Sequence, residues 1–164
     1  MRNLVFALTV LLSPAPALAS AIETAISDAE LRGKAVFRFV GLPIYEARLF
    51  TPSGAPLDWS SDFGLELNYL RNLSGEDLVD NTMSELERIG TPMPVQDQFA
   101  RCFKDVRKGD RYLAVTRGQN KIGFWRNGSP VCTVSHPRIS QRFMAIFLGD
   151  NTRSGAFTRK LKGE

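Results

Sequence analysis

Hydrophobic and polar residues alternate along one short stretch of the chain and then recur at helical spacing in the stretch that follows. From Gly64 to Tyr69 every second residue is apolar, which is typical of a half-buried strand. Ser74 then stands where a helix N-cap is expected, and apolar residues recur every three or four positions as far as Ile89. Gly90 follows and is predicted to be the C-cap of this helix. A strand that leads directly into a covering helix indicates an α+β domain with helices on a face of the sheet.

The same alternation predicts strands at 32–40 and 44–51, with a glycine and a proline in the interval 41–43. Gly and Pro at this point fit either a kink in one long strand or a tight turn between two paired strands. Three later strands are separated by turn signals and are expected to pair antiparallel. They cover 111–116, 121–125 and 130–135.

Apolar residues at helical spacing predict three more helices, at 95–103, 137–148 and 154–161. Because the helices cluster after the strands rather than alternate with them, the order of elements argues against a parallel doubly wound sheet. Residues 21–30 have mixed polarity and no clear period, so no element is predicted there.

The first 19 residues have the pattern of a secretory signal peptide. Arg2 provides a positive start, residues 4–12 form an apolar run, and Ala17-Leu18-Ala19 provides the small residues that signal peptidase accepts. The sequence therefore predicts cleavage after Ala19, export to the periplasm and a single domain over residues 20–164. The apolar run is shorter than the roughly 20 residues that a membrane-spanning helix needs, so no integral membrane segment is expected after cleavage.

The distribution of charge bears on nucleic-acid binding, and the two cysteines bear on disulfide formation. The net charge of +4 comes from scattered basic residues, without the basic stripe and interleaved aromatics of nucleic-acid binders, so no nucleic-acid partner is expected. The chain has two cysteines, Cys102 and Cys132, which are candidates for a disulfide in an oxidising compartment. The alternatives are two free thiols or a nucleophilic cysteine, although the only histidine, His136, offers no evident catalytic pair.

No motif for a cofactor or a metal is evident. The glycines are isolated rather than gathered in a phosphate-binding loop, and one histidine with two distant cysteines does not make a zinc site. Glu85 and Glu87 point about 200° apart on a helix, so they do not form an acid–base pair. The sequence therefore predicts no cofactor and no metal.

Four segments carry a further signal, and in chain order they read FRFVGLPIYEARLF, LELNYLRNLSGEDLVDNTMSELERIG, DVRKGD…FWRNGSP and SQRFMAIFLG. In this order and spacing they resemble the chalcone isomerase-like family, specifically its exported bacterial branch. The resemblance implies an open-faced β-sandwich, with an antiparallel sheet, helices layered on one face and a cleft between them. In plant chalcone isomerases that cleft holds a flavonoid, and in related plastid proteins it holds a fatty acid whose carboxylate meets an Arg and a Tyr.

The resemblance also implies which residues of this chain take the catalytic positions. The catalytic Thr of the plant strand motif falls on Val40, the catalytic Tyr on Leu78, the active-site Asn on Glu85, and the Ser or Thr of the terminal helix on Ile146. Apolar residues thus replace the hydroxyl-bearing ones. Since the loss of one such hydrogen-bond donor lowers the rate on the order of 10²-fold, no chalcone isomerase activity is expected.

Three functions remain open at this point. The first is a non-catalytic protein that binds a small apolar ligand in the cleft between sheet and helices, with Arg32, Tyr45 and Tyr69 as polar anchors. Leu78, Glu85 and Ile146 are the other residues predicted to bind this ligand. The second is an isomerase or intramolecular lyase that acts on an unrecognised substrate. The third is a structural or partner-binding envelope protein, in which bulky Phe and Leu side chains fill the cleft.

Overall fold

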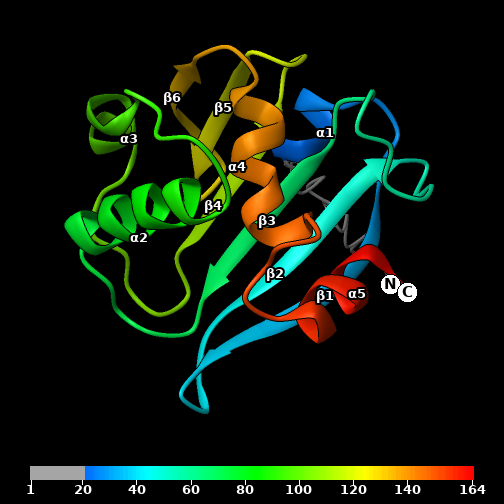
Figure 1. Ribbon diagram of the computed structural model, residues 1–164. Coiled ribbons are helices and arrows are strands. Elements are labelled where there is room, and N and C mark those ends of the chain that lie inside the picture. Colours follow the sequence, from blue (N-terminus) through cyan, green and yellow to red (C-terminus); the bar gives the residue numbers. More distant parts are fainter. Residues whose placement is uncertain (1–20) are drawn as a thin grey trace, which may run out of the picture.

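The fold is built on one antiparallel sheet whose six strands lie side by side in chain order (Figure 1). The computed structural model describes residues 21–164, so the signal peptide predicted over residues 1–19 lies outside the described residues. The strands are β1 (Ala29–Phe39), β2 (Leu42–Pro52), β3 (Gly64–Tyr69), β4 (Arg111–Thr116), β5 (Lys121–Arg126) and β6 (Ser129–Ser135). Each strand pairs antiparallel with the next, as predicted for the last three.

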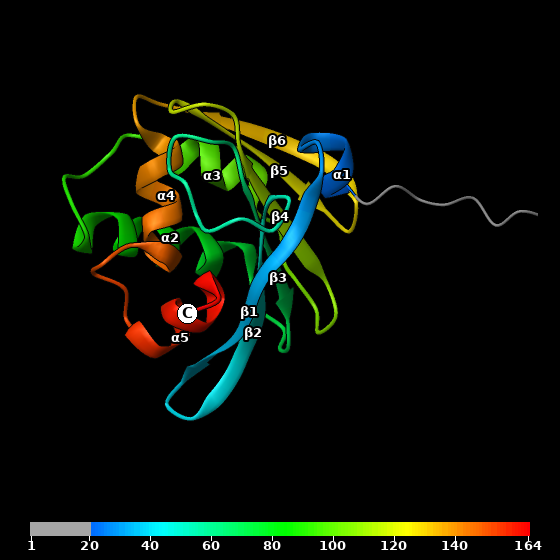
Figure 2. The same ribbon diagram turned by 90° about the vertical axis from the view of Figure 1, so that its right-hand side faces the viewer.

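Helices cover the two faces of the sheet unequally (Figure 2). They are α1 (Ala21–Ala25), α2 (Gly75–Arg88), α3 (Gln96–Cys102), α4 (Ile139–Leu148) and α5 (Gly155–Lys162). Helices α2 to α5 lie on one face, where their apolar residues form a single core with the sheet. The structure confirms the predicted α+β class and open-faced architecture.

Helix α1 lies on the opposite face of the sheet (Figure 2), in a segment for which no element is predicted from the sequence. Ile22 lies on this helix and Ile26 directly follows it. Both pack against Leu113 and Val115 of β4. The intervening β4 residues, such as Ala114, face the main core. Strand β4 is therefore buried on both faces, which explains why its residues do not alternate between buried and exposed.

Strands β1 and β2 form a hairpin, which decides between the two interpretations of the interval 41–43. Phe39 pairs with Leu42, and the turn between them consists of Val40 and Gly41, both with positive φ. A two-residue turn of this kind suits the right-handed twist of paired strands. Val40 is 84% exposed at this tip, so the expectation that it lines the cleft is wrong.

Helix α2 begins as the sequence predicts. The Ser74 side chain accepts a hydrogen bond from the backbone N–H of Asp77 at 3.0 Å, and Asp105 accepts one from the N–H of Gly75 at 2.9 Å. Two of the otherwise unpaired amides at the helix start are thus satisfied. The helix ends at Arg88 with Ile89 as its C-cap, one residue before the predicted Gly90.

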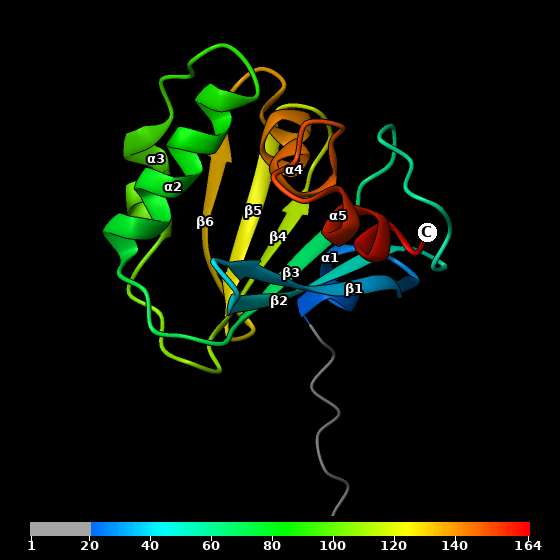
Figure 3. The same ribbon diagram turned by 60° about the horizontal axis from the view of Figure 1, so that its bottom comes forward.

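The C-terminal helix α5 lies against β1 (Figure 3). A Cβ atom at Gly33 would lie 2.5 Å from the carbonyl oxygen of Leu161, so glycine is what allows the helix end to approach this strand. Next to it, the Arg32 guanidinium donates to the carbonyl of Lys162 at 2.8 Å. A cation at the C-terminal end of a helix satisfies free carbonyls and complements the helix dipole.

A disulfide between Cys102 and Cys132 ties the end of α3 to β6, as predicted, with the two Cα atoms 5.4 Å apart. Gln98 reinforces the same link, since its side chain donates to the carbonyl of Ser135 and accepts from the N–H of Ser135. Helix α3 is therefore held over the edge of the sheet by covalent and polar contacts.

Candidate functional site

A small cavity remains between the sheet and the helices that cover it, and we call it the inner cavity. Its volume is about 50 Å³. Its lining consists of Leu65, Leu67, Tyr69, Leu78, Thr82, Phe103, Tyr112, Ala114, Phe124, Phe143 and Phe147. Aromatic rings occupy most of the surrounding space; the ring centroids of Phe103 and Phe124, for example, are 5.3 Å apart. The cleft that the family resemblance implies is present in position but largely filled.

Two tyrosine hydroxyls near the inner cavity have no hydrogen-bond partner among residues 21–164. Tyr69 lines the cavity and is only 5% exposed, and the ring of Tyr45 lies 6.3 Å away, edge to face. Burial raises the pKa of both hydroxyls well above the ordinary value. Both are therefore neutral and free to donate a hydrogen bond, whereas the hydroxyl of Tyr112 already donates to the carbonyl of Cys102.

Glu85 is paired with two arginines. Its carboxylate accepts hydrogen bonds from Arg88 at 2.6 Å and from Arg153 at 2.5 Å. Partial burial alone would raise the pKa of Glu85, but the hydrogen bonds and charges of the two guanidinium groups outweigh that effect and lower it. Glu85 is thus an ionised, engaged carboxylate, which is a poor general acid or base at neutral pH.

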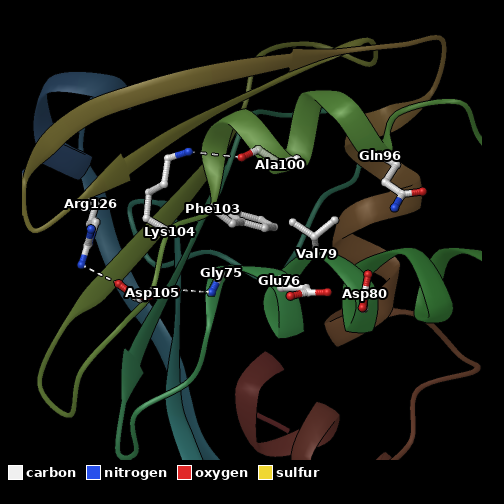
Figure 4. Close-up of a pocket in the computed structure, with 10 residues that line it drawn as sticks. All are labelled: Gly75, Glu76, Val79, Asp80, Gln96, Ala100, Phe103, Lys104, Asp105 and Arg126. Atoms are coloured by element: carbon white, nitrogen blue, oxygen red, sulfur yellow. Dashed lines mark hydrogen bonds between the residues drawn. The ribbon is translucent and has the colours of Figure 1, made fainter.

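A larger and open groove lies between α2 and α3, and we call it the outer groove (Figure 4). It has a volume of about 620 Å³. Its lining consists of Gly75, Glu76, Val79, Asp80, Gln96, Ala100, Phe103, Lys104, Asp105 and Arg126. Phe103 is the one residue that lines both spaces, so its ring forms a common wall between the inner cavity and the outer groove.

One end of the outer groove carries an arginine with an unused donor. Arg126 donates through Nη2 to the backbone carbonyl of Asp105 at 2.8 Å and to the carboxylate of Asp110 at 3.1 Å. Its Nε is buried and has no partner. A buried donor without a partner is unfavourable, so an acceptor atom on a bound molecule or a water at this end would satisfy it.

The structure brings only some of the predicted site residues together. Leu78 and Tyr69 line the inner cavity, with Tyr45 beside Tyr69. Ile146 packs against the core without lining the cavity. Arg32 is engaged by the end of α5 and lines neither space.

The sequence did not single out Phe103 or Arg126 as site residues. Phe103 stands four residues after Phe99, which is an ordinary core pattern. Arg126 is the last residue of β5. It lines the outer groove only because the folded chain places the end of β5 beside residues of α2 and α3. No local signal distinguishes either residue, since both roles depend on contacts between distant segments.

Within residues 21–164 no acidic, histidine and cysteine side chains lie together in a group that could hold a metal ion.

The helices of the same residues are all too short or too polar to span a lipid bilayer.

Comparisons with known proteins bear on the fold. No protein-family model and no curated protein sequence matches the chain. Among solved structures, the fatty-acid binding protein of Arabidopsis thaliana matches with a TM-score of 0.66, covering 84% of this chain and 88% of that chain at 9% sequence identity. The similarity extends over nearly the whole domain and agrees with the resemblance in the sequence. The chain therefore has the chalcone isomerase-like fold.

Proposed function

We propose that this protein binds a small, mainly apolar molecule between α2, α3 and the sheet, and does not catalyse a chalcone isomerase reaction. The observation that carries the proposal is the arrangement around Phe103, whose ring alone lines both an open groove and an apolar cavity behind it. One structural neighbour is a fatty-acid binding protein, which supports the proposal at the level of the fold.

The sizes of the two spaces limit how such a molecule lies. The inner cavity of about 50 Å³ is far below the roughly 300 to 1,000 Å³ of small-molecule pockets, whereas the outer groove of about 620 Å³ falls within that range. The ligand is therefore accommodated in the outer groove, and its apolar end reaches the inner cavity when the ring of Phe103 turns aside.

Polar atoms near the inner cavity and at the outer groove provide hydrogen-bond donors that would fix the orientation of the ligand. The hydroxyls of Tyr69 and Tyr45 are neutral donors without partners, and the Nε of Arg126 is a third unused donor at the groove. Apolar pockets with a few polar groups are the usual form of a small-molecule site. The three donors favour a ligand with an acceptor oxygen at one end.

Several residues argue against isomerase chemistry. Leu78 takes the position of the plant catalytic Tyr and presents an apolar side chain to the inner cavity. Val40, which takes the position of the catalytic Thr, lies at the exposed hairpin tip. Glu85 is held ionised between two arginines. At these three positions the chain thus lacks the neutral donors with which the plant enzymes would stabilise a developing oxyanion.

We also propose that the protein is exported to the periplasm after cleavage behind Ala19. The pattern of residues 1–19 and the disulfide between Cys102 and Cys132 support this, because structural disulfides persist in oxidising compartments. N-terminal sequencing of the protein from a periplasmic fraction tests the proposal. A mature chain that starts at Ser20 is the expected result, and an intact chain in the cytosolic fraction would contradict it.

A second candidate is a structural or partner-binding protein with a filled interior. The small volume of the inner cavity and the aromatic rings around it favour this function. In that case the outer groove would accept part of another protein, and no small molecule would compete for it.

Mass spectrometry of organic extracts distinguishes the two candidates. The protein is purified under native conditions from its own source, and a denatured portion of the same preparation gives the background of adhering lipids. A stoichiometric apolar compound in the native sample is the expected result. An empty extract, combined with no retention of added palmitate by the purified protein, would overturn ligand binding in favour of the second candidate.

A further inference from the structure

The tip of the β1–β2 hairpin, residues 39–42, exposes large apolar side chains to solvent. Phe39 is 59% exposed, Val40 84% and Leu42 51%. The hairpin extends beyond the rest of the molecule, at the bottom of the views in Figures 1 and 2. Apolar side chains scattered singly on a surface are ordinary, but several gathered on one exposed patch mark an interaction site. The folding of this chain gives no reason for the cluster.

The charged side chains along the hairpin are mainly basic. The paired stretches 34–39 and 42–48 contain Lys34, Arg38 and Arg48, and their one acidic residue, Glu46, is paired with Arg48. On the inner face of the hairpin, Phe157 of α5 packs against Phe37 at 5.7 Å between ring centroids. The basic residues of α5 lie in its last turn, beside Gly33 and away from the tip. Apolar residues with basic neighbours are the combination that binds anionic lipid surfaces.

The backbone at the tip is suited to a poorly hydrated environment. Phe39 and Leu42 pair across the turn, and Arg38 donates through Nη1 to the carbonyl of Gly41 at 3.3 Å. An unpaired carbonyl is unfavourable in lipid, and this contact reduces the need for water there. The long Arg38 side chain can keep its charge at the headgroup level while its methylenes lie along apolar surface.

We propose that the hairpin tip inserts into the headgroup region of a lipid bilayer that contains anionic lipids. The tip is convex and narrow, so it would offer little area to a flat protein surface, whereas a bilayer accommodates it without a preformed pocket. The excess of basic over acidic residues along the hairpin, whose one carboxylate is paired with Arg48, favours phosphate headgroups over a mixed-charge protein surface. This inference does not depend on whether the outer groove binds a ligand.

A fluorescent probe at the tip tests insertion at that position. In the full chain, Val40→Cys is labelled with nitrobenzoxadiazole while the native disulfide stays intact, and Gln119→Cys in the exposed 117–120 turn is the matched control. Vesicles of phosphatidylcholine, with or without phosphatidylglycerol, are added. We expect brighter, blue-shifted emission from position 40 with phosphatidylglycerol vesicles, weakened by added salt, and no change from position 119.

Variants then test the apolar side chains. The double substitution Phe39→Ser and Leu42→Ser should weaken vesicle binding of the labelled protein by about tenfold or more, while Phe39→Trp should preserve it. Val131→Ser, which removes an exposed apolar side chain from β6, is the control and should have no effect. Circular dichroism confirms that each variant is folded.

Three results would overturn the proposal. The first is an unchanged emission from position 40 in the presence of vesicles. The second is an equal change from position 119, which would indicate non-specific adsorption. The third is a change at position 40 that depends on protein concentration without vesicles, which would make the tip an interface between two copies of the chain.

Discussion

The Oε1 atom of Glu85 lies 2.5 Å from the Nε of Arg153, which joins helix α2 to the segment that leads into α5. Arg88 strengthens the same junction, because it pairs with Glu85 and also donates to the carbonyl of Asn151 at 2.8 Å. Helix α2 forms one wall of the outer groove, so this cluster helps to fix the wall relative to the C-terminal part of the fold.

Replacing Glu85 by Gln should make the stability of the protein less dependent on pH. The pKa of Glu85 is lowered in the folded protein, so its stabilising effect is present above the unfolded pKa of about 4.3 and is lost as the pH falls through the folded pKa. We expect Glu85→Gln to lower the free energy of unfolding by about 1 kcal/mol at pH 7, allowing for solvent screening, with the difference shrinking below about pH 4.

Urea unfolding of both proteins across this pH range measures the effect. Glu87→Gln is the matched control, because Glu87 lies on the same helix and is exposed. A difference between wild type and Glu85→Gln that stays constant down to low pH would show that the carboxylate charge is not what holds the junction.

The ring of Phe103 should control the volume available to apolar molecules. Phe103→Leu removes part of the common wall, so it should increase the binding of the apolar dye anilinonaphthalene sulfonate and lower stability by about 1 to 2 kcal/mol. Phe157→Leu is the control, because Phe157 is equally buried but lines neither space. Equal dye binding by the two variants would show that the inner cavity does not open through Phe103.

The sequence predicted the elements well where one face of an element is buried and the other is exposed. The helix after Ser74 follows this rule and appears at the expected position. The strand 64–69 is also where it was expected, although Glu66 and Asn68 on its polar face are half-buried rather than exposed. The pattern fails for α1, because a five-residue helix that buries Ile22 and Ile26 is too short to show a period.

The candidate site was harder to predict, because its geometry depends on turns and on distant contacts. The family resemblance implies that Val40 lies in the cleft, yet a two-residue turn places it at an exposed tip. Arg32 looked like a ligand anchor, but the approach of α5, which no local pattern reports, uses its donors. Tyr69 and Leu78 line the inner cavity, and each lies on an element whose buried face the period reveals; that they contact a ligand stays a prediction.

Removing the hydroxyl of Tyr69 should not destabilise the protein. Tyr69 lines the inner cavity and its hydroxyl has no partner among residues 21–164, so Tyr69→Phe should leave the free energy of unfolding unchanged or raise it by up to about 1 kcal/mol. In Tyr112→Phe the carbonyl of Cys102 loses its hydrogen-bond donor, and stability should fall by about 1 kcal/mol. Chemical denaturation of the ligand-free proteins gives both values. A clear loss in Tyr69→Phe would mean that its hydroxyl has a bound water as its partner.

Breaking the disulfide should destabilise the whole domain and loosen the wall of the outer groove that α3 provides. The Cys102–Cys132 bond closes a loop with a sequence separation of 30, for which chain entropy predicts about 3 to 4 kcal/mol. We expect the double variant Cys102→Ser and Cys132→Ser to lose this amount in urea unfolding, and the wild type to lose it only with reductant. Gln98→Ala is the control, since it removes the hydrogen bonds of the same α3–β6 link and should lower stability by only about 1 kcal/mol. Labelling of the denatured wild-type protein by iodoacetamide without reductant would contradict the bond itself. A loss no larger than that of Gln98→Ala would show that the hydrogen bonds alone suffice to hold α3 on the sheet.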